Sequence, residues 1–134
     1  MRLDDIKDLA CAEIDSRADH LISLAKDILH TPETGFREFK TAGRVAREFG
    51  DMCIKFEQGI GITGLKGVLN TKDRSGPNVA IMGELDALKV LGHPYANLET
   101  SAAHACGHHC QIAMMIGVGI GLQAEGVLDS LCGR

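Results

Sequence analysis

The sequence contains few aromatic residues and no excess of basic ones. It has no tryptophan, one tyrosine and four phenylalanines, so stacking platforms for bases or sugars are not expected. Fourteen Lys and Arg residues stand against 18 Asp and Glu residues, and the net charge is −4. Because nucleic-acid binding needs a basic surface, and no run of Lys or Arg occurs, nucleic acid is not an expected partner.

Long apolar runs and signs of export are also missing. No apolar run approaches the roughly 18 residues of a membrane span, and the N-terminal sequence MRLDDIKD is too acidic for a secretory signal. We therefore expect no membrane contact and a cytoplasmic location. The five cysteines are odd in number and irregularly spaced, which favours free thiols or metal ligands over a disulfide framework in a reducing compartment.

The overall composition, with 45% hydrophobic and 24% charged residues, is typical of one globular domain. Apolar residues recur at helical spacing over residues 4–30, which predicts an amphipathic helix with a break near Ser16. A second helix is predicted over 40–49, closed by Gly50. A third helix is predicted over 109–123, and its glycines at 117, 119 and 121 indicate close packing against a sheet.

Between the second and third helices, short runs rich in Val, Ile and Leu predict strands over 54–57, 64–70 and 78–85. The last of these runs is apolar at consecutive positions, as in a strand that is buried on both faces. A surface turn is expected over 71–77 and a loop over 89–103. The order of helix, helix, strands, loop and helix predicts a layered α/β domain.

The stretch HACGHHCQ, residues 104–111, places three histidines and two cysteines in eight positions. In an extended segment, Cys106 and His108 would project from the same face, and Gly107 would let the backbone approach an ion. A thiolate and an imidazole suit zinc, with manganese, cobalt and nickel as other possible ions. Two ligands do not complete a metal site, so a reactive cysteine and an incidental cluster stay open as alternatives.

A second group of polar residues occurs in GELDAL, residues 83–88, at the carboxyl end of the predicted strand over 78–85. Glu84 and Asp86 are two residues apart and would lie on one side of that strand. Sites in α/β proteins are built at such strand ends. A carboxylate there can bind a metal or orient a ligating histidine, although capping a helix or facing solvent are the simpler roles for both acids.

Three segments, LHTPETGFREFKTA (29–42), GELDAL (83–88) and HACGHHCQIAMMIG (104–117), resemble, in this order, three signatures of one family. It is the amidohydrolase branch of the aminoacylase and carboxypeptidase metallopeptidases. The resemblance implies a layered catalytic domain of zinc-exopeptidase type, with a smaller lid or dimerisation domain inserted later in the chain. It also implies a small-molecule amide substrate such as an N-acyl amino acid, and a site of two divalent ions, with zinc as the first candidate, where water attacks the amide carbonyl. Exposed strand edges and apolar surface in an incomplete sheet further predict a homo-oligomer.

The resemblance assigns roles at individual positions. Cys106 and His108 fall on metal ligands of the family, and Asp86 falls on the catalytic-site aspartate that supports the metal from outside its ligand shell. His104 opens the same motif and receives no role. His109 and Gln111 stand where aspartate and a second histidine are common, departures that concern substrate choice more than metal binding.

The family's later Glu-Glu pair, which includes the general base, and its later histidine ligands have no counterpart in residues 1–134. The resemblance therefore predicts that this chain is the N-terminal part of a catalytic domain, without the lid domain and the C-terminal half, and inactive alone. Two alternatives stay open. One is a non-catalytic binding module that keeps the fold, and the other is a redox or nucleophilic protein that uses Cys106 or Cys110.

Overall fold

The computed structural model describes residues 1–70 and 76–134. Its elements, in chain order, are the following: α1 (Leu3–Ser16), α2 (Ala18–Leu29), α3 (Phe39–Asp51), β1 (Phe56–Ile60), β2 (Gly64–Gly67), β3 (Leu88–Lys89), β4 (Ala102–Ala103), α4 (His108–Gln123) and the 3-10 helix η1 (Leu128–Ser130). Helices and two small antiparallel sheets are thus combined, which is compatible with the predicted α/β class. Most of the turn predicted over 71–77 lies outside the described residues.

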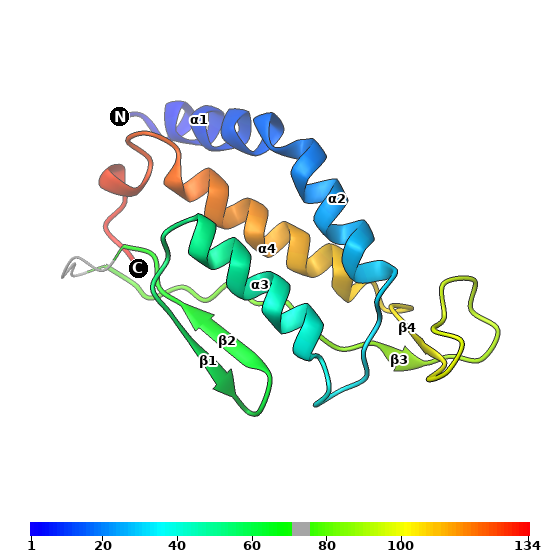
Figure 1. Ribbon diagram of the computed structural model, residues 1–134. Coiled ribbons are helices and arrows are strands. Elements are labelled where there is room, and N and C mark those ends of the chain that lie inside the picture. Colours follow the sequence, from blue (N-terminus) through cyan, green and yellow to red (C-terminus); the bar gives the residue numbers. More distant parts are fainter. Residues whose placement is uncertain (71–75) are drawn as a thin grey trace.

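The first predicted helix is present and is broken as expected. Arg17 separates α1 from α2, and its backbone angles, φ −108° and ψ 13°, leave the helical region. Both helices pack on α4, so the chain bends at Arg17 to follow one side of that helix (Figure 1). A local break in an amphipathic sequence therefore sets the path of the first layer.

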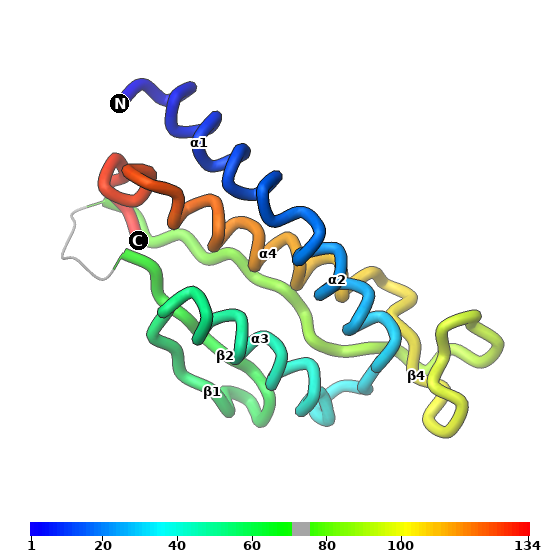
Figure 2. The backbone as a smooth tube through the Cα atoms, turned by 45° about the horizontal axis from the view of Figure 1, so that its top comes forward, coloured from blue at the N-terminus to red at the C-terminus, as the bar shows by residue number. Residues whose placement is uncertain are grey.

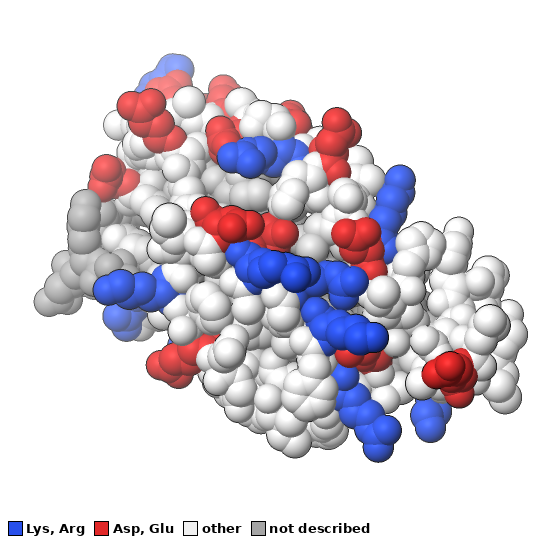
Figure 3. All heavy atoms as spheres, viewed as in Figure 1, with Lys and Arg blue, Asp and Glu red and all other residues white. Residues whose placement is uncertain are grey.

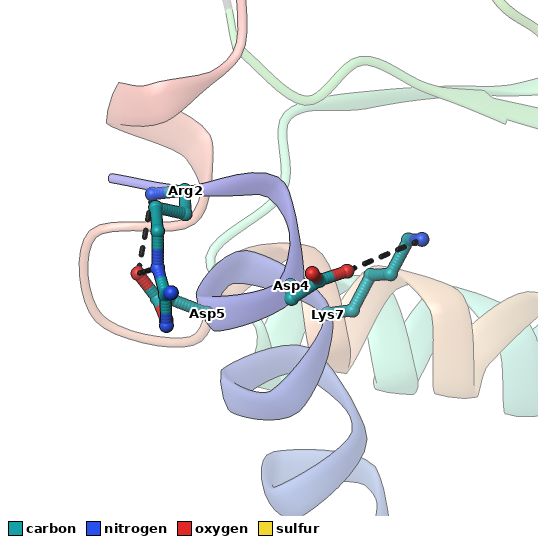
Figure 4. A network of polar contacts seen from close by, with 4 residues as sticks. All are labelled: Arg2, Asp4, Asp5 and Lys7. Carbon is teal, nitrogen blue, oxygen red and sulfur yellow. Dashed lines mark hydrogen bonds and ion pairs between the residues drawn. The ribbon is translucent and has the colours of Figure 1, made fainter.

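Charged side chains hold the start of α1, as Figure 4 shows. The Arg2 backbone N–H donates to Asp5 Oδ2 at 3.2 Å, and the Arg2 guanidinium lies 2.8 Å from Asp5 Oδ1. The guanidinium lowers the pKa of Asp5 below its usual value. Lys7 lies 3.9 Å from Asp4 on the neighbouring side of the helix. Since no residue of α1 is fully buried, these contacts act on an exposed helix end.

Helix α4 is the centre of the structure, with α1 and α2 on one side and α3 beside it (Figure 1). Ile112 and Ile116 of α4 and Ile28 of α2 have no exposed surface. The rest of the core cluster comes from α2, α3 and the start of the hairpin: Leu24, Val45, Phe49 and Ile54. Burial of these side chains, worth about 1.5 to 3 kcal/mol each, is the main force that joins the helices.

The glycines of α4 allow close packing, but against helices and not, as predicted, against a sheet. A Cβ atom at Gly121 would lie 2.9 Å from Ile14 Cδ1 of α1, and one at Gly117 would lie 3.2 Å from Leu21 Cδ1 of α2. At Gly119 the nearest atom is Met52 Sδ, just beyond α3. The predicted partner was wrong because, among the described residues, the atoms nearest to these three glycines belong to α1, α2 and Met52 rather than to a strand.

A β-hairpin covers one side of α3. Strands β1 and β2 pair antiparallel, with Phe56 opposite Gly67, and a bulge lies near Gln58 and Ile60. The two strands start or end a few residues from the predicted limits, 54–57 and 64–70. Phe49 of α3 and Phe56 of β1 contact edge to face at a centroid distance of 5.6 Å, which fixes the hairpin on the helix.

The predicted strand over 78–85 is not formed, and this prediction was wrong. Residues 77–86 run beside α4 without a place in a sheet (Figure 2), and Val79 and Met82 are 67% and 83% exposed. The physical reason is that a strand needs a hydrogen-bonded neighbour. In the described chain the backbone–backbone hydrogen bonds of this part are limited to its ends, at Pro77 and Val79 with Arg134 and at Ala87 with Glu33.

The predicted loop over 89–103 contains a small sheet of its own. Its strands β3 and β4 pair antiparallel, with Leu88 opposite Ala103. Ala102 and Ala103 are fully buried, so β4 anchors the chain immediately before the histidine-cysteine stretch.

Acidic and basic side chains are interspersed on the face shown in Figure 3, where Lys and Arg form a band next to Asp and Glu. Within the part of the chain that the structure describes, no helix combines the length and the apolar character that crossing a membrane requires.

Candidate functional site

The three segments that carry the family resemblance meet in the structure. Ala87 of the second segment donates a backbone hydrogen bond to Glu33 of the first at 2.8 Å, and an isolated parallel bridge joins Ala87 to Thr34. The second segment then contacts the third through His108 at the start of α4. Segments that are up to about 70 positions apart in the sequence thus form one continuous region.

His108 lies between two carboxylates, and we call this group the Glu84–His108–Asp86 cluster. Its Nδ1 is 2.8 Å from the backbone carbonyl oxygen of Asp86 and 3.0 Å from Asp86 Oδ1. Its Nε2 is 2.8 Å from Glu84 Oε2. The His108 side chain is only 12% exposed, whereas that of Glu84 is 64% exposed. The imidazole is therefore fixed from both sides, with Glu84 on the solvent side.

These contacts fix the hydrogen positions on the ring. Both groups near Nδ1 are acceptors, so Nδ1 carries a hydrogen and donates it to Asp86. This leaves Nε2 as the nitrogen that can bind a metal when it carries no proton. In the observed arrangement Nε2 faces the Glu84 carboxylate, with its Oε2 at 2.8 Å. Orientation of His108 by Asp86, one of the options that the sequence suggested, is the contact observed.

Cys106 lies in a turn, and the extended geometry considered for Cys106 and His108 is wrong. The Gly107 N–H donates to the His104 carbonyl at 3.2 Å, which closes the turn. Gly107 has φ +81°, a conformation that favours glycine, and it directly precedes α4. The Cys106 thiol is exposed and free, as are the other four cysteines.

The donor chemistry of Cys106 and His108 suits a divalent ion, but the group is incomplete. Among residues 1–70 and 76–134, no three His, Cys, Asp or Glu side chains come together in a way that could hold a metal ion. The ring orientation of His108 is the feature that fits metal binding, because its second nitrogen is held by Asp86 and its Nε2 is directed outward.

The rings of His104 and His109 form a separate pair. Their ring centroids are 5.6 Å apart, and His109 turns toward His104 while His108 turns toward Asp86. His104 is 4% exposed, and in the described structure neither of its ring nitrogens has a hydrogen-bond partner. Burial, together with the nearby His109 and His108, lowers the pKa of His104 to about 4. His104 is thus neutral at pH 7.

Two acidic residues that the sequence motifs did not single out support the region. Glu33 accepts hydrogen bonds from the Lys40 and Thr41 backbone amides at 3.1 and 2.9 Å, and so caps the start of α3. Glu38 is 6% exposed and accepts a bond from Thr63 Oγ1 at 2.8 Å, which ties α3 to the hairpin. The signal for Glu33 was an acid shortly before a helix, but its distance from the first helical residue concealed the cap.

Comparison with known proteins finds relatives that are hydrolases. The chain is 29% identical over 103 residues to "Thermostable carboxypeptidase 2" of Saccharolobus solfataricus, a match that covers 74% of this chain and 26% of that protein. It is 28% identical over 102 residues to "IAA-amino acid hydrolase ILR1-like 2" of Arabidopsis thaliana, covering 74% and 23%. It is 34% identical over 84 residues to the "Hippurate hydrolase" of Campylobacter jejuni, covering 60% and 22%.

The chain spans about a quarter of the length of these relatives. No family model matches the sequence, and no solved structure matches it. The relatives agree with the family that the three segments resemble, although the identity is low and part of the chain is covered. The chain is therefore similar, at low identity, to carboxypeptidases and amidohydrolases over about a quarter of their length.

Proposed function

We propose that residues 1–134 are the N-terminal part of the catalytic domain of a metal-dependent amidohydrolase of layered zinc-exopeptidase type. The substrate class is an N-acyl amino acid or a short peptide, because the relatives are named as a hippurate hydrolase, an IAA-amino acid hydrolase and a carboxypeptidase. The observation that carries the proposal is the orientation of His108 by Asp86, within a region where all three family segments meet.

In this proposal Cys106 and His108 hold a divalent ion, with zinc as the first candidate. A bound ion would polarise the amide carbonyl and activate water for attack. Asp86 positions the His108 ring: it accepts a hydrogen bond from Nδ1–H of His108 and so leaves Nε2 for the ion. The general base and the remaining ligands, including those of a second ion, would come from outside these 134 residues. The chain alone is expected to be inactive.

The cytoplasm is the compartment we propose for this protein. All five cysteines are free and exposed, and exposed thiols persist in a reducing environment. The proposed ligand Cys106 would also need to stay reduced in order to bind an ion as a thiolate.

The first experiment reads the coding sequence beyond codon 134. The proposal expects an open frame that continues with an apolar strand and a Glu-Glu pair. A stop codon directly after Arg134, confirmed in the transcript, would instead favour the alternative of a binding module that keeps the fold.

The second experiment measures hydrolysis of N-acyl amino acids by the longer protein and by the 134-residue chain, with zinc, manganese or cobalt present. Asp86→Ala should lower the activity of the longer protein about 10- to 100-fold, as is typical when a partner of a metal ligand is removed. Glu57→Ala, at an exposed position of β1, is the control and should not change the rate. Hydrolysis by the 134-residue chain alone at a comparable rate would contradict the proposal.

A further inference from the structure

We propose that Glu84 binds the divalent ion together with Cys106 and His108, through the carboxylate oxygen that faces His108 Nε2. This inference rests on the proposed function, which assigns Cys106 and His108 to metal binding and gives Glu84 no role. It makes the site a set of one thiolate, one imidazole and one carboxylate, supplied by two segments of the chain that meet at the start of α4.

The backbone of Glu84 is held beside α4. Its N–H donates to Gln111 Oε1 at 3.2 Å, and Gln111 lies one helical turn after His108. The preceding residue, Gly83, approaches α4 so closely that a Cβ there would be 3.3 Å from both the Cα and the N of Ile112. The position of the Glu84 carboxylate near His108 therefore follows from packing of the backbone, and only the side-chain torsions remain free.

The separation of the two donor atoms suits a shared ion. Glu84 Oε2 and His108 Nε2 are 2.8 Å apart, while two such donors on one zinc ion lie roughly 3 Å apart, since each bond is about 2 Å. The two distances differ by a few tenths of an ångström. The Glu84 carboxylate can move by this amount because its side chain is 64% exposed and is not confined by packing.

The orientation of the His108 ring is restricted. The ring is 12% exposed, and two contacts with Asp86 hold Nδ1. Nε2 must therefore point toward the space beside Glu84, and an ion bound to Nε2 would be next to the Glu84 carboxylate. Placing a carboxylate away from such an ion would forfeit a strong electrostatic interaction.

Cys106 has to turn toward this pair, since the three donors are not assembled in the described part of the chain. It is exposed and lies two residues before His108, in the turn closed by Gly107. A thiolate and a carboxylate would neutralise the two charges of the ion, with His108 as a neutral ligand. Three mixed ligands and an open position are typical of catalytic zinc sites, and the sulfur ligand favours zinc or cobalt over magnesium or calcium.

The test is a cobalt(II) titration of the 134-residue chain under reducing conditions, followed by visible absorption, with zinc titration by calorimetry as a second measurement. Wild type should show the bands of tetrahedral cobalt and a thiolate charge-transfer band. Glu84→Gln should weaken binding of both ions at least about tenfold, which is the lower limit even for loss of an outer partner. It should also shift the cobalt bands. Glu57→Gln makes the same change of charge in β1 and should bind as wild type does.

Further variants separate ligation from charge. Glu84→Asp keeps the negative charge but shortens the side chain, so it should also weaken binding at least about tenfold; wild-type affinity in this variant would overturn the inference. Cys106→Ser should remove the charge-transfer band, and His108→Ala should abolish binding. If both of these have their expected effect while Glu84→Gln binds as tightly as wild type, Glu84 is not a ligand and the proposed function survives. If the wild-type chain binds neither ion, or if Cys106 and His108 are dispensable, the inference fails together with the metal role in the proposed function.

Discussion

The helical layer around α4 and the segment 77–86 beside it are both rich in apolar residues, yet they are packed to very different degrees. In the helical layer Ile28, Ile112 and Ile116 have no exposed surface. In the segment, Val79 and Met82 are 67% and 83% exposed. The difference does not follow from hydrophobicity, because both regions have enough apolar surface to drive burial.

Hydrogen bonding explains the difference. A helix satisfies its backbone groups internally, so it needs only an apolar partner for one face. An extended segment needs neighbours for its backbone as well as for its side chains. Among the described residues, the backbone amides from 80 to 83 donate no hydrogen bond. The helices therefore satisfy their backbone groups internally and bury one apolar face in the core cluster, whereas the segment 77–86 still has unpaired backbone groups among the described residues.

The largest effect is expected from a cavity in the helical layer. Ile116→Ala should lower the free energy of unfolding by about 2 to 5 kcal/mol, because the buried side chain leaves a space that its neighbours fill only in part. Urea unfolding followed by circular dichroism measures the loss. Met114→Ala, on the same helix at 63% exposure, is the control and should change stability by no more than about 0.5 kcal/mol. If both variants lost the same free energy of unfolding, the buried face of α4 would not be the centre of the core.

The next effect concerns His104, which lies where β4 passes into α4. Burial lowers the pKa of His104 to about 4, with smaller contributions from His109 and His108. Above about pH 6.5 the residue is neutral in the folded and unfolded states and contributes no pH dependence. Below that pH the unfolded chain takes up the proton first, so stability should fall, by up to about 3 kcal/mol, until the folded state also binds it near pH 4.

Unfolding free energies at pH 7 and pH 4.5 measure this loss. His104→Leu removes the titrating group and should make the difference between the two pH values smaller. His30→Leu replaces an exposed histidine and should leave that difference unchanged. A pH dependence that is the same in the His104 variant as in wild type would assign the loss to other groups.

A smaller effect, with opposite signs in two helices, is expected for glycine substitutions. Gly121→Ala should cost about 1 kcal/mol, because the new Cβ would lie 2.9 Å from Ile14 Cδ1 and 3.1 Å from the Ala10 carbonyl oxygen, a cost that exceeds the gain in helix propensity. Gly43→Ala in α3 has no atom within 4 Å of the new Cβ and should stabilise by up to about 1 kcal/mol. Thermal unfolding of both variants tests the close contact of α1 with α4, which would be disproved if both stabilised equally.

The smallest effect on stability, within about 0.5 kcal/mol, is expected for Met82→Lys in the exposed segment. We expect the wild-type chain to self-associate through this segment, since unpaired backbone and exposed apolar side chains recruit other chains. Met82→Lys should then reduce the associated fraction in sedimentation velocity. Met114→Lys places the same charge at an exposed position of α4 and should not reduce it. A monomeric wild type, or equal effects of the two variants, would contradict this expectation.

Helix positions were predictable because their signals are local. The break predicted near Ser16 lies at Arg17, and the helix predicted from residue 109 begins at His108. Helical spacing and a residue with a special backbone conformation, such as Gly107, act over only a few positions. The same locality explains the failure at 78–85: an apolar run shows that a strand is possible, but its pairing depends on residues far away in the sequence or outside it.

For the candidate site, the sequence by itself determined which side chains are available. Asp86, Cys106 and His108 were selected from two short motifs, and a contact between a carboxylate and the second nitrogen of a histidine was one of the options. Only the tertiary structure decided that Glu84 faces His108 Nε2, that Cys106 lies in a turn, and that His104 is buried beside His109. The physical reason is that these distances result from packing of the segment 83–86 on the first turns of α4, across more than 20 positions of intervening chain, and the residue pattern contains no information on that separation.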